Sequence, residues 1–139
     1  MTKYENQNIF ARILRGELPC TKVYEDDDVL TFMDIMPRAD GHMLVIPKTP
    51  SRTLMDTAPE VLSKLILATQ KMAKAAQTAF DADGITIHQF NESSGGQVVF
   101  HVHFHVIPRF DGVELNPHSG RMEDAGVLAG FAERIKAVV

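Results

Sequence analysis

Several residue types and segment types are scarce or absent in this chain, and each absence excludes a class of protein or a kind of partner. The one cysteine, Cys20, cannot form an internal disulfide or a multi-cysteine zinc site, so we expect a reducing cytoplasm. No run of Lys and Arg exceeds a pair and the formal charge is −4, which argues against polymeric nucleic acid or an anionic membrane as a partner. No stretch approaches the roughly 20 apolar residues that span a bilayer. Residues 1–20 also lack the apolar core of a signal peptide.

The residues that are present suffice for one domain. A chain of 139 residues that is 45% hydrophobic can build a real core. Neither an internal repeat nor a long linker divides it. We therefore predict a single domain over residues 1–139, with a core at about 8–109 and a C-terminal extension at 110–139.

The first half of the chain predicts a short helix and three strands. Asn8 can cap a helix whose apolar positions repeat at helical spacing and which ends before Gly16. Residues 21–25 and 29–35 flank three aspartates and predict a hairpin. Residues 42–47 predict a third strand, which ends in a proline that cannot donate to a ladder.

The second half predicts the longest helix, two more strands and a last helix. The long helix begins near Asp56 or Thr57, presents an apolar stripe from Leu62 to Phe80, and can end at Gly84. Strands follow at 85–90 and 98–107, then a surface loop at 111–121 and an amphipathic helix from about Asp124. This order predicts an α+β fold, an antiparallel sheet of about five strands with a long helix and shorter terminal helices.

Three histidines alternate with apolar residues in the segment that runs from Phe100 to Arg109. Because side chains alternate across a strand, His101, His103 and His105 should share one face of the sheet. A solvent-exposed polar face is the plainest interpretation, and zinc binding is another, because two histidines at i and i+2 can share an ion. Three histidines of one straight strand are harder to fit around a single ion, since the Cα atoms of His101 and His105 would lie roughly 13 Å apart.

Catalysis is the interpretation that uses all three rings. An imidazole with an ordinary pKa of about 6.5 is basic yet largely neutral near pH 7, as a nucleophile must be. Flanking imidazoles can donate hydrogen bonds to phosphoryl oxygens and oppose protonation of the central ring.

The segment resembles the signature of the histidine triad superfamily, His-φ-His-φ-His-φ-φ with φ apolar, at every position from His101 to Ile107. The resemblance extends from Asn8 to about Arg109 and is closest to the bacterial and Hint-like branch. It implies a homodimer that hydrolyses or transfers at the α-phosphate of nucleotide conjugates through a nucleotidyl-histidine intermediate. Adenosine phosphoramidates, aminoacyl-adenylates and dinucleoside polyphosphates are the substrate classes that it leaves open.

Carried over by position, the resemblance makes His103 the nucleophile and His101 and His105 its phosphate and leaving-group partners. His42 becomes a fourth active-site histidine, although its place alone suggests an exposed residue at a strand start. Asp34 resembles the acceptor of ribose hydroxyls, although an aspartate before Pro37 also suits a turn.

The same resemblance assigns the remaining substrate contacts. Asn91 and Gln97 resemble polar phosphate-site residues, in a stretch that by itself predicts only a hairpin loop. Apolar residues resemble the wall of an adenine slot, although such residues also form ordinary core; they are Ile9, Phe10, Ile13, Phe32, Ile35 and Leu44. His88 and His118 match no catalytic position, and we expect them to be structural or exposed.

Two departures from the family pattern affect the predicted chemistry. The residues from Asn8 to Ala11 replace two cysteines that form a structural zinc site in some bacterial relatives, so we expect neither a metal nor a cofactor. Val98 replaces a serine of the eukaryotic Hint proteins and so removes one phosphate hydrogen bond. A regulatory module that binds nucleotides with little turnover is the alternative function, and the intact triad argues against it.

Overall fold

The computed structural model describes residues 3–117 and 120–139, which leaves His118 and part of the predicted loop at 111–121 outside the described residues. In these ranges the strands are β1 (Lys22–Glu25), β2 (Val29–Met33), β3 (Met43–Pro47), β4 (Gly84–His88) and β5 (Phe104–Arg109). The helices are α1 (Ile9–Leu14), α2 (Pro59–Phe80) and α3 (Ala125–Lys136), with a 3-10 turn at Ser93–Gly95. The strands form one antiparallel sheet in the order β1-β2-β3-β5-β4, which confirms the predicted α+β architecture.

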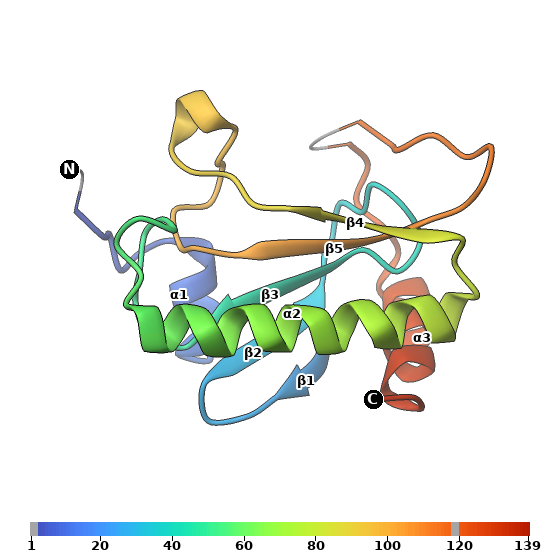
Figure 1. Cartoon of the computed structure of the whole chain (residues 1–139), viewed down its shortest axis with the longest axis horizontal. Helices are drawn as coiled ribbons and strands as arrows, with labels where there is room; N and C mark the ends of the chain where they lie inside the picture. Colours follow the sequence, from blue (N-terminus) through green and yellow to red (C-terminus); the bar gives the residue numbers. More distant parts are fainter. Residues whose placement is uncertain (1–2, 118–119) are drawn as a thin grey trace.

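The two faces of the sheet carry different layers. Helix α2 lies along one face, with α3 beside it near β1 (Figure 1). Alternate residues of β2, β3 and β5 point to this face and pack on Leu65, Met72 and Ile135. The opposite face carries a smaller apolar cluster beneath α1 and, as shown below, the histidines.

Local chemistry accounts for the first elements as predicted. The Asn8 carboxamide oxygen accepts from the N–H of Ala11 and caps α1. The Asp26 carboxylate accepts from the N–H groups of Asp28 and Val29, which closes the β1–β2 hairpin.

The ends of α2 differ from the prediction. The helix begins at Pro59 after Ala58, with Asp56 and Thr57 in the preceding turn. It ends at Phe80 because Asp81 takes the left-handed conformation that stops a helix, at φ 49°. Gly84 therefore does not end the helix but begins β4.

The histidine strand begins later than predicted. We predicted a strand over residues 98–107, but β5 starts at Phe104, so His101 and His103 lie in an irregular lead-in. Ladder pairing explains this start, because Phe104 is the first residue of β5 that pairs with β3. At the other end of β5, Pro108 pairs with β4 alone, because β3 pairs only with residues 104–106. The nitrogen of Pro108 is on the side where β3 has ended, so its lack of an N–H costs no ladder hydrogen bond.

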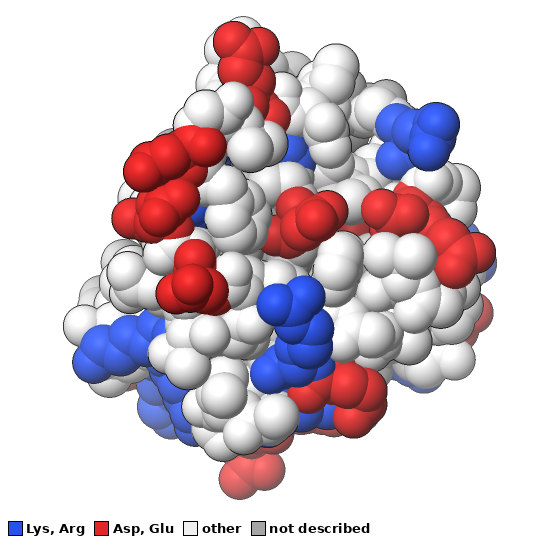
Figure 2. All heavy atoms as spheres, turned by 90° about the vertical axis from the view of Figure 1, so that its right-hand side faces the viewer, with Lys and Arg blue, Asp and Glu red and all other residues white. Residues whose placement is uncertain are grey.

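The surface adds two observations. The first concerns the helices: none of those in the described ranges is both long enough and apolar enough to cross a bilayer. On the face seen in Figure 2, separate groups of acidic and basic side chains alternate, so this face presents no broad basic surface.

Candidate active site

The three histidines lie on the α1 side of the sheet. His105 pairs with Leu44 in the ladder and so shares the face of the apolar cluster beneath α1. The ring of Phe10 packs edge-on against His103 at 4.9 Å between centroids, and the rings of His103 and His105 are 5.0 Å apart. The structure thus brings the predicted triad together, although only His105 belongs to a regular strand.

The hydrogen bonds of His103 determine which of its nitrogens is basic. Its Nδ1 lies 2.6 Å from the carbonyl oxygen of His101. Because a carbonyl only accepts, Nδ1 must carry the proton and donate it, which leaves a lone pair on Nε2. Burial lowers the pKa of His103 to about 4, which keeps the ring neutral near pH 7.

His101 is held by the protein at both ring nitrogens. Its Nε2 lies 2.8 Å from the carbonyl oxygen of Pro47, so Nε2 carries the proton and donates. Its Nδ1 then accepts from the hydroxyl of Tyr4 at 2.7 Å. The ring is fully buried, and this burial lowers its pKa. Both ring nitrogens of His101 are therefore hydrogen-bonded to other groups of the protein.

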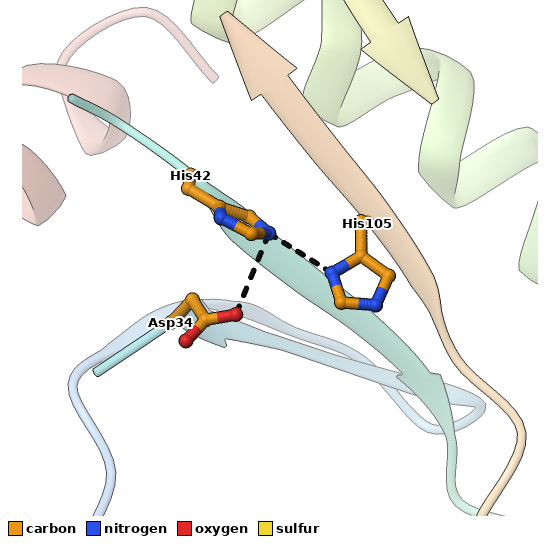
Figure 3. Close-up of side chains that lie close together, drawn as sticks. All are labelled: Asp34, His42 and His105. Carbon is orange, nitrogen blue, oxygen red and sulfur yellow. Dashed lines mark hydrogen bonds and ion pairs between the residues drawn. The ribbon is translucent and has the colours of Figure 1, made fainter. Parts of the chain in front are cut away.

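His42, His105 and Asp34 form a second cluster, drawn in Figure 3. The backbone N–H of Arg38 donates to Nδ1 of His42 at 3.0 Å, so the proton of neutral His42 sits on Nε2. That nitrogen lies 2.9 Å from Nδ1 of His105 and 3.4 Å from Oδ2 of Asp34. His42 thus donates toward His105, whose own proton then sits on Nε2. Contrary to its place in the sequence, His42 is buried rather than exposed.

Asp34 lies directly after β2 and combines a turn role with an unusual carboxyl. Its Oδ1 accepts from the N–H of Met36 at 2.8 Å, as expected of an aspartate that forms a turn. Burial raises the pKa of Asp34 to about 6. The other oxygen, Oδ2, faces His42, so the carboxyl also belongs to the histidine cluster.

The apolar residues of the predicted slot divide into two groups. Phe10, Phe32 and Leu44 form one buried cluster, and Ile13 packs against it. Ile9 and Ile35 lie largely at the surface, with exposed fractions of 53% and 49%. The cluster that contacts the triad is therefore the part that contains Phe10.

Asn91 and Gln97 are engaged mainly in holding loops. The Gln97 carboxamide accepts from the N–H of Glu92 and donates to the carbonyls of Arg52 and Val99. These bonds use both amide protons. The Asn91 oxygen accepts from the N–H of Leu54 and from the Gln89 amide. Both residues thus shape the 89–99 connection that leads into the histidine segment.

Sequence reasoning missed two residues that form hydrogen bonds with the histidine rings. Tyr4 lies 97 positions before His101, and no spacing pattern links the two. Arg38 acts through its backbone N–H, so its side chain gives no signal. The turn that contains Arg38 is held by Asn116, whose N–H donates to the Arg38 carbonyl and whose own carbonyl accepts from Arg38 Nε. The C-terminal extension therefore supports the site from outside.

One group of possible metal ligands occurs in the described ranges, formed by Asp34, His42 and His105, with ligand atoms within 4.8 Å of one another. This spacing alone would suit an ion. However, a histidine ligand normally donates its other N–H to an acceptor, whereas Nδ1 of His42 meets the N–H donor of Arg38. A metal on Nε2 would have to displace the proton that this bond places there. The group is therefore better suited to hydrogen bonding than to metal binding.

One face of the antiparallel sheet holds neutral, buried histidines around the unprotonated Nε2 of His103 and so defines a histidine-centred site. Comparison with known proteins identifies the family of the chain. The family model described as the HIT domain matches residues 15–112. The chain belongs to the HIT domain family.

Relatives agree with this assignment in sequence and in structure. The adenylylsulfatase HINT3 of Arabidopsis thaliana is 39% identical over 76% of this chain, which spans about half (53%) of that protein. The crystal structure of a Hit-like protein involved in cell-cycle regulation from Bartonella henselae has a TM-score of 0.95 and 51% identity, covering 99% of this chain and 100% of that one. A hypothetical histidine triad nucleotide-binding protein from Sulfolobus tokodaii has a TM-score of 0.84 and 27% identity, covering 93% of this chain and 89% of that one.

The stretch from Asn8 to Ala11, where the family resemblance places the two cysteines of a zinc site, does not suit a metal. The Asn8 oxygen is engaged in capping α1, and Ala11 offers no ligand atom. The Asn8 side chain therefore stabilises the start of α1, and the Ala11 side chain is buried.

Proposed function

We propose that the protein hydrolyses or transfers at the α-phosphate of nucleotide conjugates, with His103 as the nucleophile. The observation that carries this proposal is the bond from Nδ1 of His103 to the His101 carbonyl, which leaves Nε2 as a lone pair on a neutral ring. Such a nitrogen can attack phosphorus without first losing a proton.

The reaction proceeds in two displacements. Nε2 of His103 forms a bond to the α-phosphorus while the P–N or P–O bond to the leaving group breaks, and the leaving amine or oxyanion takes up a proton. Water then attacks the same phosphorus and gives up one proton, which replaces the proton taken up by the leaving group; the Nε2–P bond breaks, and a mononucleotide leaves. Dividing one difficult step into two lets the same geometry serve twice.

The second histidine pair supplies donors for this chemistry. Because His42 donates toward Nδ1 of His105, His105 carries its own proton on Nε2 and can offer it to a phosphoryl oxygen or the leaving group. A preset tautomer needs no reorganisation during the reaction, which is how such donors lower a barrier.

The surroundings favour an adenosine conjugate. The adenine would pack against the apolar cluster of Phe10, Phe32 and Leu44, with Ile13, Ile9 and Ile35 at its margin. Asp34 would accept from ribose hydroxyls, and the loop that Asn91 and Gln97 hold would approach the phosphates. Relatives support this class, because one is named an adenylylsulfatase and another a nucleotide-binding protein.

The proposal extends to the setting in which the protein works. We infer a homodimer in a reducing cytoplasm that acts on small nucleotides without a metal or cofactor, as a phosphoramidase or a dinucleoside-polyphosphate hydrolase. The single cysteine and the His42 tautomer support the redox setting and the metal-free chemistry.

A covalent adduct distinguishes this enzyme from a module that only binds nucleotides. The protein is incubated with adenosine 5′-phosphoramidate in the presence of a chelator, denatured at neutral pH, and analysed by peptide mass spectrometry. We expect an added adenylyl group on His103 and release of AMP. Nucleotide binding with neither adduct nor AMP would favour the regulatory module, and turnover that stops with the chelator and returns with zinc would overturn the metal-free mechanism.

A further inference from the structure

Tyr4 joins the site from the N-terminal segment that precedes α1. Its hydroxyl lies 2.7 Å from Nδ1 of His101, and its ring meets the His101 ring edge-on at 5.6 Å between centroids. Burial raises the pKa of Tyr4, so its hydroxyl keeps its proton near neutral pH and remains a donor.

The direction of this bond follows from the other side of the ring. The Pro47 carbonyl can only accept, so it fixes the His101 proton on Nε2 and leaves Nδ1 unprotonated. Tyr4 must therefore donate. Since a donor at Nδ1 favours the neutral ring, the tyrosine also opposes protonation of His101.

His101 in turn contacts the proposed nucleophile through its backbone. Its carbonyl oxygen accepts from Nδ1 of His103 at 2.6 Å, the bond that leaves Nε2 of His103 basic. His101 precedes β5, so no ladder bond of this strand fixes its carbonyl. Side-chain bonds to Tyr4 and Pro47, together with the bond from the Val102 N–H to the Ser51 carbonyl, hold this stretch instead.

We propose that Tyr4 is a positioning residue: its hydroxyl anchors the His101 ring and thereby the carbonyl that aligns His103 for attack. The proposal rests on the proposed function, in which His103 is the nucleophile. Tyr4 itself does not touch the reacting atoms, so it should affect the rate of the chemical step more than the affinity for substrate.

The chain offers a matched pair of tyrosines for the test. Tyr4→Phe keeps the ring and removes only the hydroxyl. Tyr24→Phe removes a hydroxyl that donates to Asp26 on the exposed β1 hairpin. The wild type and both variants are compared with adenosine 5′-phosphoramidate as substrate, and the imidazole nitrogens are followed by 15N NMR.

We expect Tyr4→Phe to lower kcat by about three- to tenfold with KM unchanged, since a single hydrogen bond contributes about that factor. The Nδ1 resonance of His101 should move downfield as its hydrogen bond is lost, and the Nδ1–H proton of His103 should exchange faster with water. Tyr24→Phe should leave all three measurements at wild-type values.

The NMR readout separates failure of this inference from failure of the proposed function. If the wild type proves inactive, the nitrogen shifts still show whether Tyr4 holds His101 and His103. An unchanged His103 proton in Tyr4→Phe, or an unchanged kcat in an active enzyme, would overturn the positioning role. A raised KM with normal kcat would instead place Tyr4 in contact with substrate.

Discussion

His103 is the residue on which the proposed chemistry depends most directly. We expect His103→Ala to reduce turnover by several orders of magnitude, because the substitution removes the Nε2 lone pair that the bond to the His101 carbonyl leaves available for attack. The imidazole is only 6% exposed and packs on Phe10, so the substitution should also cost about 1–3 kcal/mol of folding free energy. Initial rates and thermal unfolding measured on the same preparation check both effects. A folded variant with near-normal hydrolysis would show that another residue is the nucleophile.

At this scale the sequence predicted where the histidines lie better than how they are hydrogen-bonded. Alternation of histidine with apolar residues predicted that His101, His103 and His105 share a face, and they do, although two of them precede the strand. The tautomers could not be predicted, because they depend on the backbone carbonyls of Pro47 and His101 and on the backbone N–H of Arg38, for which the side-chain pattern gives no signal.

The turn before β3 contacts the histidine cluster through the backbone N–H of Arg38, which donates to His42. Gly41 there has φ +85°, a conformation that disfavours a side chain, and an added Cβ would lie 2.5 Å from Cε2 of Phe80 at the end of α2. We expect Gly41→Ala to lower the free energy of unfolding by about 2–4 kcal/mol, from backbone strain plus overpacking. Urea denaturation measures the change.

Gly16→Ala is the matched control for this prediction. Gly16 has a similar φ of +78°, but an added Cβ there meets nothing within 4 Å. Its substitution should cost only the strain, about 1–2 kcal/mol. Equal losses in the two variants would mean that the Phe80 ring moves aside freely and that the turn is not braced by α2.

Element types could be predicted from sequence, and element ends could not. Periodicity located the helices and strands because apolar spacing reflects which face is buried. The end of α2 at Asp81 depends on a left-handed residue that is not glycine, and the start of β5 depends on where the neighbouring strands end. Such boundaries arise from tertiary pairing, which local composition does not encode.

For the molecule as a whole, two buried groups make opposite contributions to the pH dependence of stability. Asp34 titrates at about 6 in the fold against 3.8 ordinarily, so the folded state binds extra protons and stability falls as pH rises through this window. His103 titrates at about 4 against 6.5, so the folded state binds fewer protons and stability rises across its window. Each contribution is on the order of 3 kcal/mol.

Single substitutions should separate these contributions. Asp34→Asn removes the fall, so its stability should increase more steeply than that of the wild type between about pH 4 and about pH 6.5. His103→Asn removes the increase in stability that His103 contributes, so its free energy of unfolding should rise less with pH than that of the wild type, or fall. His101, whose pKa burial also lowers, contributes a rise in both variants. Urea denaturation at the two pH values checks the prediction, and parallel profiles for the two variants would contradict it.

The assembly state is the largest-scale expectation, since the family resemblance implies a homodimer. The predicted apolar stripe of α2 from Leu62 to Phe80 is not the surface for a second copy, because Leu65, Met72 and Phe80 are buried in this chain's own core. The apolar residues that α2 does expose are Ile66 and Leu67. Strand β4 is an edge of the sheet and exposes Ile87 on the α2 side, since Ile85, two residues earlier, packs into that core.

An edge strand with an apolar residue beside an apolar helix surface favours pairing with an identical edge, which would satisfy the backbone groups of β4 and cover Ile66, Leu67 and Ile87. We expect light scattering of the wild type at micromolar concentration to give twice the 15.4 kDa of one chain. Ile87→Lys should shift the mass to that of the monomer, because lysine at an edge opposes strand addition.

Val127→Lys is the matched control, since Val127 is also exposed, at 40% against 41% for Ile87, but lies on α3. A wild-type mass near 15.4 kDa would eliminate the dimer, and dissociation by Val127→Lys alone would move the interface to α3.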